Sequence, residues 1–423
     1  MFAGLALSVV VTGAALPAAV DDGGQWWYSA YNVDQAHAAG WTGKGVKVAV
    51  IGQQINPDYA GLAGARLTVD PDPICQGATV VNTAPSKQST HDTDVTSFLI
   101  GNGQGAGVRG IAPDAEVTFI GYGDGACSLA YDAENPTITP FGAALKRAMK
   151  DGARIVTTST GGGQASDGDG AVLAEAIARG VVVVSAPPNR VSDQKNGEAP
   201  NSLRGVVSVS AIDASGNPML DSTTREPVIV PNVTVAAAGV NIVSNSDTSW
   251  DSPGPSSGSS LATPIVAGMV ALAAQKYPAA TGDQLIQSLI HNTGRDDHPL
   301  EYSSTDGLGY GAASLTHLLR VDPSQYPDEN PLLNKDPRLN GADYLPTDAQ
   351  LADARTALGS ATGTPTASAP ASTVDPPETA SDGILTGVVI AAIVVVVLII
   401  VGAIITIVLV TRNTRRNHRK DTP

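Results

Sequence analysis

Gly258-Ser259-Ser260-Leu261-Ala262-Thr263-Pro264-Ile265-Val266-Ala267-Gly268 is the stretch of this 423-residue chain that says most about its fold. A serine at the start of a helix directs its hydroxyl outward, and its backbone N–H remains available to an oxyanion. The small residues that follow allow such a helix to enter a core closely. Taken alone, Ser260 could be an N-cap, the commonest role of serine before an apolar helical run.

Apolar runs alternate with helical patterns on both sides of this stretch. Several of the runs are continuously apolar, as strands covered on both faces of a parallel sheet are. The predicted strands are Val46–Ile51, Glu116–Gly121, Arg154–Ser159, Val181–Ser185, Val206–Ala211 and Val233–Ala237. The predicted helices are Phe141–Lys150, Ala171–Arg179, Ala262–Lys276 and Gly282–His291. This alternation predicts an α/β fold with a mostly parallel central sheet covered by helices.

The string around Ser260 resembles the Gly-Thr-Ser-x-Ala-x-Pro nucleophile motif of the subtilisin-like serine proteases, with Ser259 in place of threonine. Other landmarks of that family follow in their usual order. Thr90–Val95 resembles the His-Gly-Thr-x-Val block, which implies that His91 is the general base. Val182 to Asn189 resembles the strand that ends in Ala-Ala-Gly-Asn, which implies that Asn189 donates to the oxyanion.

Further blocks strengthen the resemblance, which covers about residues 41–319. Gly107–Ala115 is similar to the Gly-Val-Ala-Pro-x-Ala segment that follows the histidine block. The resemblance implies a three-layer subtilisin-like fold and serine endopeptidase activity. It also implies that substrate pairs as an added strand with a backbone edge. The residues implied for that edge are Ser159, Thr160, Gly161 and Gly162.

Three departures from the family pattern lie at or beside the implied catalytic residues. Family members end the first strand with Val-x-Val-Ile-Asp-x-Gly, whereas this chain has Gly52 at the position of the triad acid. The residue after His91, usually glycine, is Asp92, and Pro188 replaces the glycine before Asn189. Because the acid orients the imidazole, its loss in a subtilisin costs about 3 × 10⁴ in turnover. The sequence therefore predicts an attenuated protease or, alternatively, a pseudoprotease.

Four nearby side chains are candidates to accept from the imidazole in place of the missing acid. They are Gln53, Gln54, Asp92 and Asp94. Asp94 would share a helix face with His91 if a helix begins there. The simpler interpretation of the two aspartates is compensation of the helix dipole in a first turn. If only the acid is lacking, Gly52→Asp should raise peptidase activity by orders of magnitude.

Composition and charge exclude several classes of protein. Hydrophobic residues make up 42% of the chain, which excludes a disordered protein. The net charge is −15, although the last twelve residues hold five Lys/Arg against one Asp, so the remainder is more acidic still. Such a surface repels nucleic acid.

No His/Asp/Glu cluster has the spacing of a zinc site, and no metal or cofactor is expected. The two cysteines, Cys75 and Cys127, predict a disulfide in an oxidising compartment.

The two ends of the chain predict export and membrane anchoring. Residues 1–20 read as a secretory signal sequence without the usual basic start, and 21–40 as an N-terminal extension. Residues 384–410 carry no charge over 27 positions, long enough for one transmembrane helix. The basic tail, 411–423, predicts a cytoplasmic C-terminus and an extracytoplasmic domain over residues 41–320.

The segment between the domain and the predicted membrane helix changes in composition. Residues 321–358 form a Pro-rich extension, expected as an extended strap, and 359–383 a Thr/Ala/Ser/Pro-rich flexible stalk. This order of parts resembles the mycosins, membrane-anchored proteases associated with type VII secretion in actinobacteria. The resemblance implies a polypeptide substrate and a possible place beside a secretion-channel complex. The pseudoprotease alternative would bind peptide or brace that complex.

Overall fold

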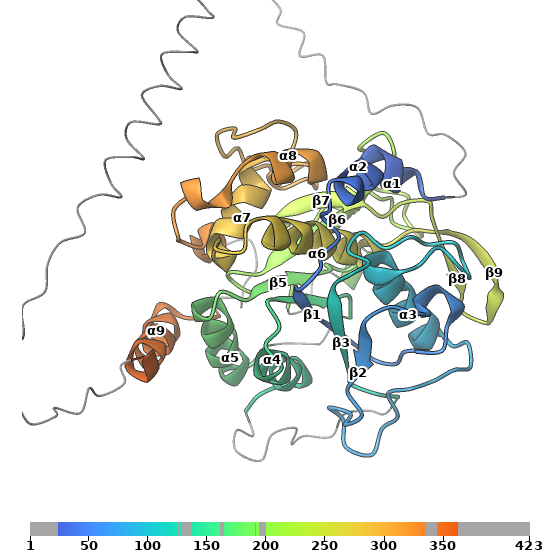
Figure 1. The fold of residues 1–423 in the computed structure, drawn as a ribbon, viewed down its shortest axis with the longest axis horizontal. Helices are drawn as coiled ribbons and strands as arrows, with labels where there is room; N and C mark the ends of the chain where they lie inside the picture. The colour runs from blue at the N-terminus through green and yellow to red at the C-terminus, as the bar shows by residue number, and fades with distance from the viewer. Residues whose placement is uncertain are drawn as a thin grey trace, which may run out of the picture. The chain divides into compact units, whose positions relative to one another are not determined.

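One parallel sheet forms the centre of the protein (Figure 1). The computed structural model describes residues 24–124, 127, 137–160, 165–190, 192–193, 200–334 and 345–362. The seven strands lie in the order β2-β3-β1-β4-β5-β6-β7. Their bounds are β1 Lys47–Gly52, β2 Leu67–Val69, β3 Glu116–Gly121, β4 Ile155–Thr158, β5 Val182–Ser185, β6 Val207–Ile212 and β7 Val235–Ala238. All six predicted strands are present, shifted by one or two residues at some ends.

Helices cover the sheet on both faces (Figure 1). Alternate residues of β1 join different cores: Val48 and Val50 pack in one apolar cluster, Ala49 and Ile51 in the other. The first cluster includes α3, α6, α7 and α8; the second includes α4 and α5. The helices are α1 Trp26–Ala30, α2 Val33–Ala38, α3 Lys87–Ile100, α4 Pro140–Lys150, α5 Asp167–Ala178, α6 Ser259–Lys276, α7 Gly282–His291, α8 Leu315–Arg320 and α9 Asp348–Thr362. The double covering explains why the strand sequences are apolar throughout.

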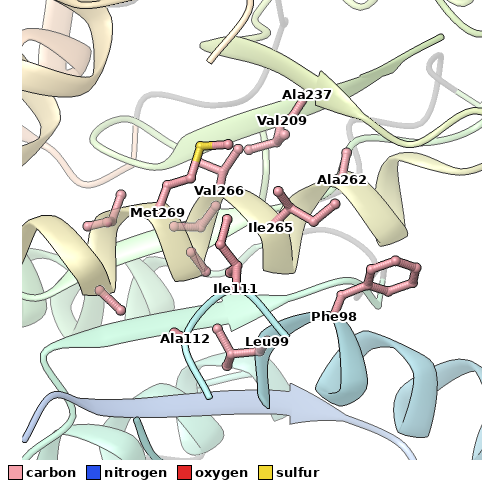
Figure 2. Close-up of a cluster of buried hydrophobic side chains, with 14 of the residues drawn as sticks. Phe98, Leu99, Ile111, Ala112, Val209, Ala237, Ala262, Ile265, Val266 and Met269 are labelled. Carbon is pink, nitrogen blue, oxygen red and sulfur yellow. The ribbon is translucent and has the colours of Figure 1, made fainter. Parts of the chain in front are cut away.

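The long helix α6 is the most deeply buried helix, which is why its sequence lacks a polar face. Figure 2 shows its residues Ile265, Val266 and Met269 against side chains of the sheet and of the segment that carries Ile111. A Cβ on Gly268 would lie 1.8 Å from Cγ2 of Ile111. Only glycine permits this approach, so the small residues of the motif fix the position of α6 and of the serine at its start.

The N-terminal extension packs on the same core. Trp27 of α1 is fully buried, and its ring centroid lies 5.7 Å from that of Phe98 on α3. The backbone N–H of Val243 donates to the carbonyl of Gly24, which joins the extension to β8. Residues 24–40 are therefore part of the folded domain.

Several elements were not predicted from the sequence. An antiparallel hairpin, β8 (Ile242–Ser246) and β9 (Ser249–Ser256), lies outside the parallel sheet. In the Pro-rich extension, the short 3-10 turns Pro323–Gln325 and Pro331–Asn334 form in place of an extended strap, and α9 follows. Helix α9 also includes the first residues of the predicted stalk. It forms because its apolar side docks on α5, which buries Leu351.

The remaining topological predictions concern the disulfide and the membrane span. Cys75 and Cys127 are joined in a disulfide with a Cα–Cα distance of 4.8 Å. Within the ranges that the structure describes, no helix is long and apolar enough to cross a membrane. The predicted signal sequence, residues 1–20, and the predicted span, residues 384–410, lie outside those ranges.

Candidate active site

The carboxyl ends of β4 and β5 and the starts of α3 and α6 line one cavity. Open parallel sheets bind ligands at these strand ends. The cavity has a volume of about 370 Å³, and its lining includes His91, Ser159, Asn189 and Ser260. The fold therefore brings together the residues predicted as nucleophile, base and oxyanion donor, which come from three separate segments of the chain.

Ser260 is the second residue of α6 and 8% exposed. Pro264 follows four residues later and has no N–H to donate to the carbonyl of Ser260. That carbonyl accepts instead from the hydroxyl of Ser159, at 2.8 Å, just past β4. Thus the proline in the motif frees a backbone carbonyl that ties the first turn of α6 to the carboxyl end of β4.

Asn189 is held in one orientation by Ser259. The carbonyl oxygen of the Asn189 side chain accepts from the backbone N–H of Ser259 at 2.8 Å, and the Ser259 hydroxyl lies at the same distance. Because Oδ1 is engaged there, Nδ2 is the end that can donate elsewhere. Ser259 therefore performs an orienting role at the position where the family motif has threonine.

Three polar groups lie close to one small volume beside the Cα of Gly258. A Cβ on Gly258 would lie 3.0 Å from Oγ of Ser260, 3.3 Å from Nδ2 of Asn189 and 3.8 Å from the backbone N of Ser260. The backbone N–H of Ser260 also stands in the first turn of a long helix, where the helix dipole favours negative charge. Glycine at 258 leaves this volume open. The arrangement can stabilise an oxyanion next to the nucleophile.

His91 is the fifth residue of α3, a helix that begins with a capping box between Ser86 and Ser89. Its Nδ1 lies 2.7 Å from Oδ1 of Asp92, and its side chain is 33% exposed. His91 and Ser260 line the same cavity but share no hydrogen bond. Bonds of this kind commonly tighten only in the complex with substrate.

The pKa of His91 reflects opposing effects. Burial lowers it, but the hydrogen bond to Asp92 and the negative charge of that residue raise it, with smaller contributions from Asp94 and Asp247. The net result is a pKa above the ordinary value of 6.5. Protonated His91 is therefore stabilised by the carboxylates around it, as a general base requires once it has taken a proton.

Asp94 is not the partner of His91, although α3 contains both. Its carboxylate accepts from the backbone and the side-chain amide of Asn245. Asp92 and Asp94 are each 3% exposed and lie beyond the first turn of α3, so the alternative of first-turn dipole compensation is wrong. Gln54 binds Thr79 and Asn82 with its side chain. Of the four candidates, Asp92 alone hydrogen-bonds to His91 in the described part of the chain.

The predicted substrate edge is only partly described. Ser159 lines the cavity, and Thr160 follows it. Gly161 and Gly162 lie outside the described residues. The edge stays a prediction from the sequence.

Comparison with known families settles the class of protein. The subtilase family model matches residues 43–311, more than half of the chain. The protein belongs to the subtilase family. The matched range includes His91, Asn189 and Ser260, and it ends before α8.

Individual relatives agree with this assignment. The subtilase is 28% identical over 270 residues to a thermostable alkaline protease of Halalkalibacterium halodurans, a match that covers 62% of this chain and 66% of the relative. It is 29% identical over 276 residues to subtilisin BL of Lederbergia lenta, covering 63% and 90%. In fold it is similar to MycP1 from the ESX-1 type VII secretion system, with a TM-score of 0.53, 20% identity and coverage of 73% and 88%.

Proposed function

We propose that this subtilase is a serine endopeptidase that acts on polypeptides outside the cytoplasm. The observation that supports this most directly is the convergence of Ser260, His91 and Asn189 on one cavity, with Oγ and two N–H donors around Gly258. A protein that only bound peptide would not need these donors beside a serine hydroxyl.

In this mechanism Ser260 Oγ attacks the carbonyl carbon of the scissile peptide bond, and Nε2 of His91 takes its proton. The carbonyl oxygen becomes an oxyanion, which Asn189 Nδ2 and the Ser260 N–H stabilise. The C–N bond then breaks as His91 gives its proton to the leaving amine. Water, activated by His91, attacks the acyl-enzyme, and the proton returns to Ser260 Oγ as the acid product leaves.

The extracytoplasmic and membrane-anchored placement is part of the proposal. It rests on the signal-like residues 1–20, the uncharged run 384–410 and the basic tail after it. The disulfide between Cys75 and Cys127 supports an oxidising compartment. A chain truncated after residue 363 should move from the membrane fraction to the soluble extracytoplasmic fraction.

The fold likeness to MycP1 and the order of parts favour a place beside a type VII-like secretion complex. The competing function, a pseudoprotease that binds peptide or braces such a complex, is favoured by Gly52. The two candidates differ in whether Ser260 is an activated nucleophile.

Labelling of the full chain, in solubilised membranes, with a serine-directed fluorophosphonate tests this difference. We expect labelling of the wild type and none of Ser260→Ala, with His91→Ala reduced to near background because the base is lost. Labelling that persists in Ser260→Ala would refute the assigned nucleophile. A folded wild-type protein that does not label would support the pseudoprotease.

A further inference from the structure

We propose that Asp92 supplies the carboxylate that orients His91, from helix α3, in place of the missing acid on strand β1. This inference rests on the proposed protease function and concerns a positioning residue, since Asp92 acts on substrate only through His91. A single exchange, of the acid at position 52 and the glycine at position 92, then accounts for both departures from the family pattern near the histidine.

Both carboxylate oxygens of Asp92 are committed. Oδ1 lies 2.7 Å from Nδ1 of His91. Oδ2 accepts from the backbone N–H groups of Gln53 and Gln54, the latter at 3.1 Å. These two N–H groups follow directly after the end of β1. The carboxylate of Asp92 is therefore fixed between the end of β1 and the imidazole ring.

Gly52 makes this placement possible. A Cβ on Gly52 would lie 2.6 Å from Oδ2 and 2.7 Å from Cγ of Asp92, closer than real Cβ contacts come. The carboxylate of Asp92 thus occupies the space into which a side chain at position 52 would extend. Where the family pattern has an acid at the strand end and glycine after the histidine, this chain has the two residue types exchanged, and one carboxylate remains beside the histidine.

The contact has a direct chemical consequence. Nδ1 faces a carboxylate oxygen, so Nδ1 carries the proton in neutral His91 and Nε2 keeps the lone pair that must accept from Ser260. When Nε2 is protonated, the charge of Asp92 stabilises the imidazolium. These are the two tasks of a triad acid, and the backbone position of that acid does not enter either of them.

Substitution at both positions tests the inference. Asp92→Asn is expected to lower kcat/KM about 10⁴-fold, because an amide can present N–H to Nδ1 and favour the wrong tautomer. The pH at which activity appears should also fall, since the carboxylate that raises the pKa of His91 is lost, leaving Asp94, Asp247 and Lys87 as the other charged groups near the ring.

The reciprocal exchange Gly52→Asp with Asp92→Gly is the decisive variant. Placing the acid on β1 should raise kcat/KM at least about 100-fold over Asp92→Gly alone. Melting temperatures show that each variant is folded. The inference is overturned if Asp92→Asn stays within about tenfold of wild type, or if the folded exchange variant is no better than Asp92→Gly.

A measurement that needs no catalysis separates this inference from the proposed function. In the Ser260→Ala variant, a pH titration of the resonances of isotope-labelled histidine gives the pKa of His91. The His91 resonance is assigned by its absence from His91→Gln. Adding Asp92→Asn should lower that pKa; an unchanged pKa overturns the pairing. A wild-type protein without activity whose His91 still responds to Asp92→Asn would refute the endopeptidase proposal and leave the pairing established.

Discussion

Two sides of the cavity follow the subtilase pattern to different degrees. The nucleophile side consists of α6 and the loop after β5, and the base side consists of α3 and the end of β1. The first departs from the pattern at Ser259 and Pro188 but keeps Ser260 and Asn189 in place, with Ser259 orienting Asn189. The second exchanges the residue types at positions 52 and 92 and still places a carboxylate 2.7 Å from His91. The comparison teaches that a carboxylate can be brought beside the histidine from either of two backbone positions, 52 or 92.

The largest of the remaining expected effects is a loss of kcat on the nucleophile side. Asn189→Ala removes an oxyanion donor and should lower kcat by about 10²–10³-fold without shifting the pH profile, because His91 and its carboxylates are untouched. Ser259→Ala is the matched control: it removes a hydroxyl that lies against Asn189 but keeps the donor, so its loss should be smaller. A loss below about tenfold for Asn189→Ala, or a loss no larger than that of Ser259→Ala, would contradict the role of Asn189 as an oxyanion donor.

The base side predicts a loss where the sequence alone predicted a gain. Because the carboxylate of Asp92 fills the space next to Gly52, both Gly52→Asp and Gly52→Ala must displace it. We expect each to lower kcat/KM, by about 10²-fold for a displacement near 1 Å. Steady-state kinetics with melting temperatures would measure this. An increase in activity for Gly52→Asp would restore the earlier expectation and contradict the assignment of Asp92.

The smallest expected effect concerns stability at Asp94, which faces the base side but does not contact His91. Burial raises its pKa to about 7. Below about pH 4 both folded and unfolded chains hold this proton; between about pH 4 and 7 the unfolded chain releases it first, so the native state loses stability as the pH rises.

Asp94→Asn should remove this dependence. The melting temperature of the variant, relative to that of the wild type, should therefore be higher at pH 8 than at pH 5. In a domain of 150–250 residues about 1 kcal/mol shifts the melting temperature by about 2–4 °C, and in this larger domain the shift should be smaller for the same free energy. Asp353→Asn, at an exposed position of α9, serves as the control. A constant difference across this range would show that Asp94 ionises normally in the folded protein.

The sequence by itself determined the fold class and six of the seven strands of the parallel sheet, and it pointed to Ser260, His91 and Asn189, which the structure brings to one cavity. These follow from local order: continuous apolar runs specify strands buried on both faces, and short motifs keep their spacing because each lies on one element. Helix α9 and the β8-β9 hairpin could not be predicted in the same way. Helix α9 is stabilised mainly by docking on α5, which buries Leu351. The two strands of the hairpin pair with each other, but β9 contains two prolines and a glycine and lacks the alternating apolar pattern of a strand.

Only the tertiary structure decided which carboxylate serves His91. The sequence offered Gln53, Gln54, Asp92 and Asp94 as near neighbours, and helix geometry singled out Asp94, which would share a helix face with His91. The carboxylate of Asp92 can lie beside His91 because Gly52 has no side chain to fill that space. The two backbone N–H groups that hold the carboxylate come from the end of β1, 38 and 39 residues away, and become its neighbours only when α3 packs against the sheet.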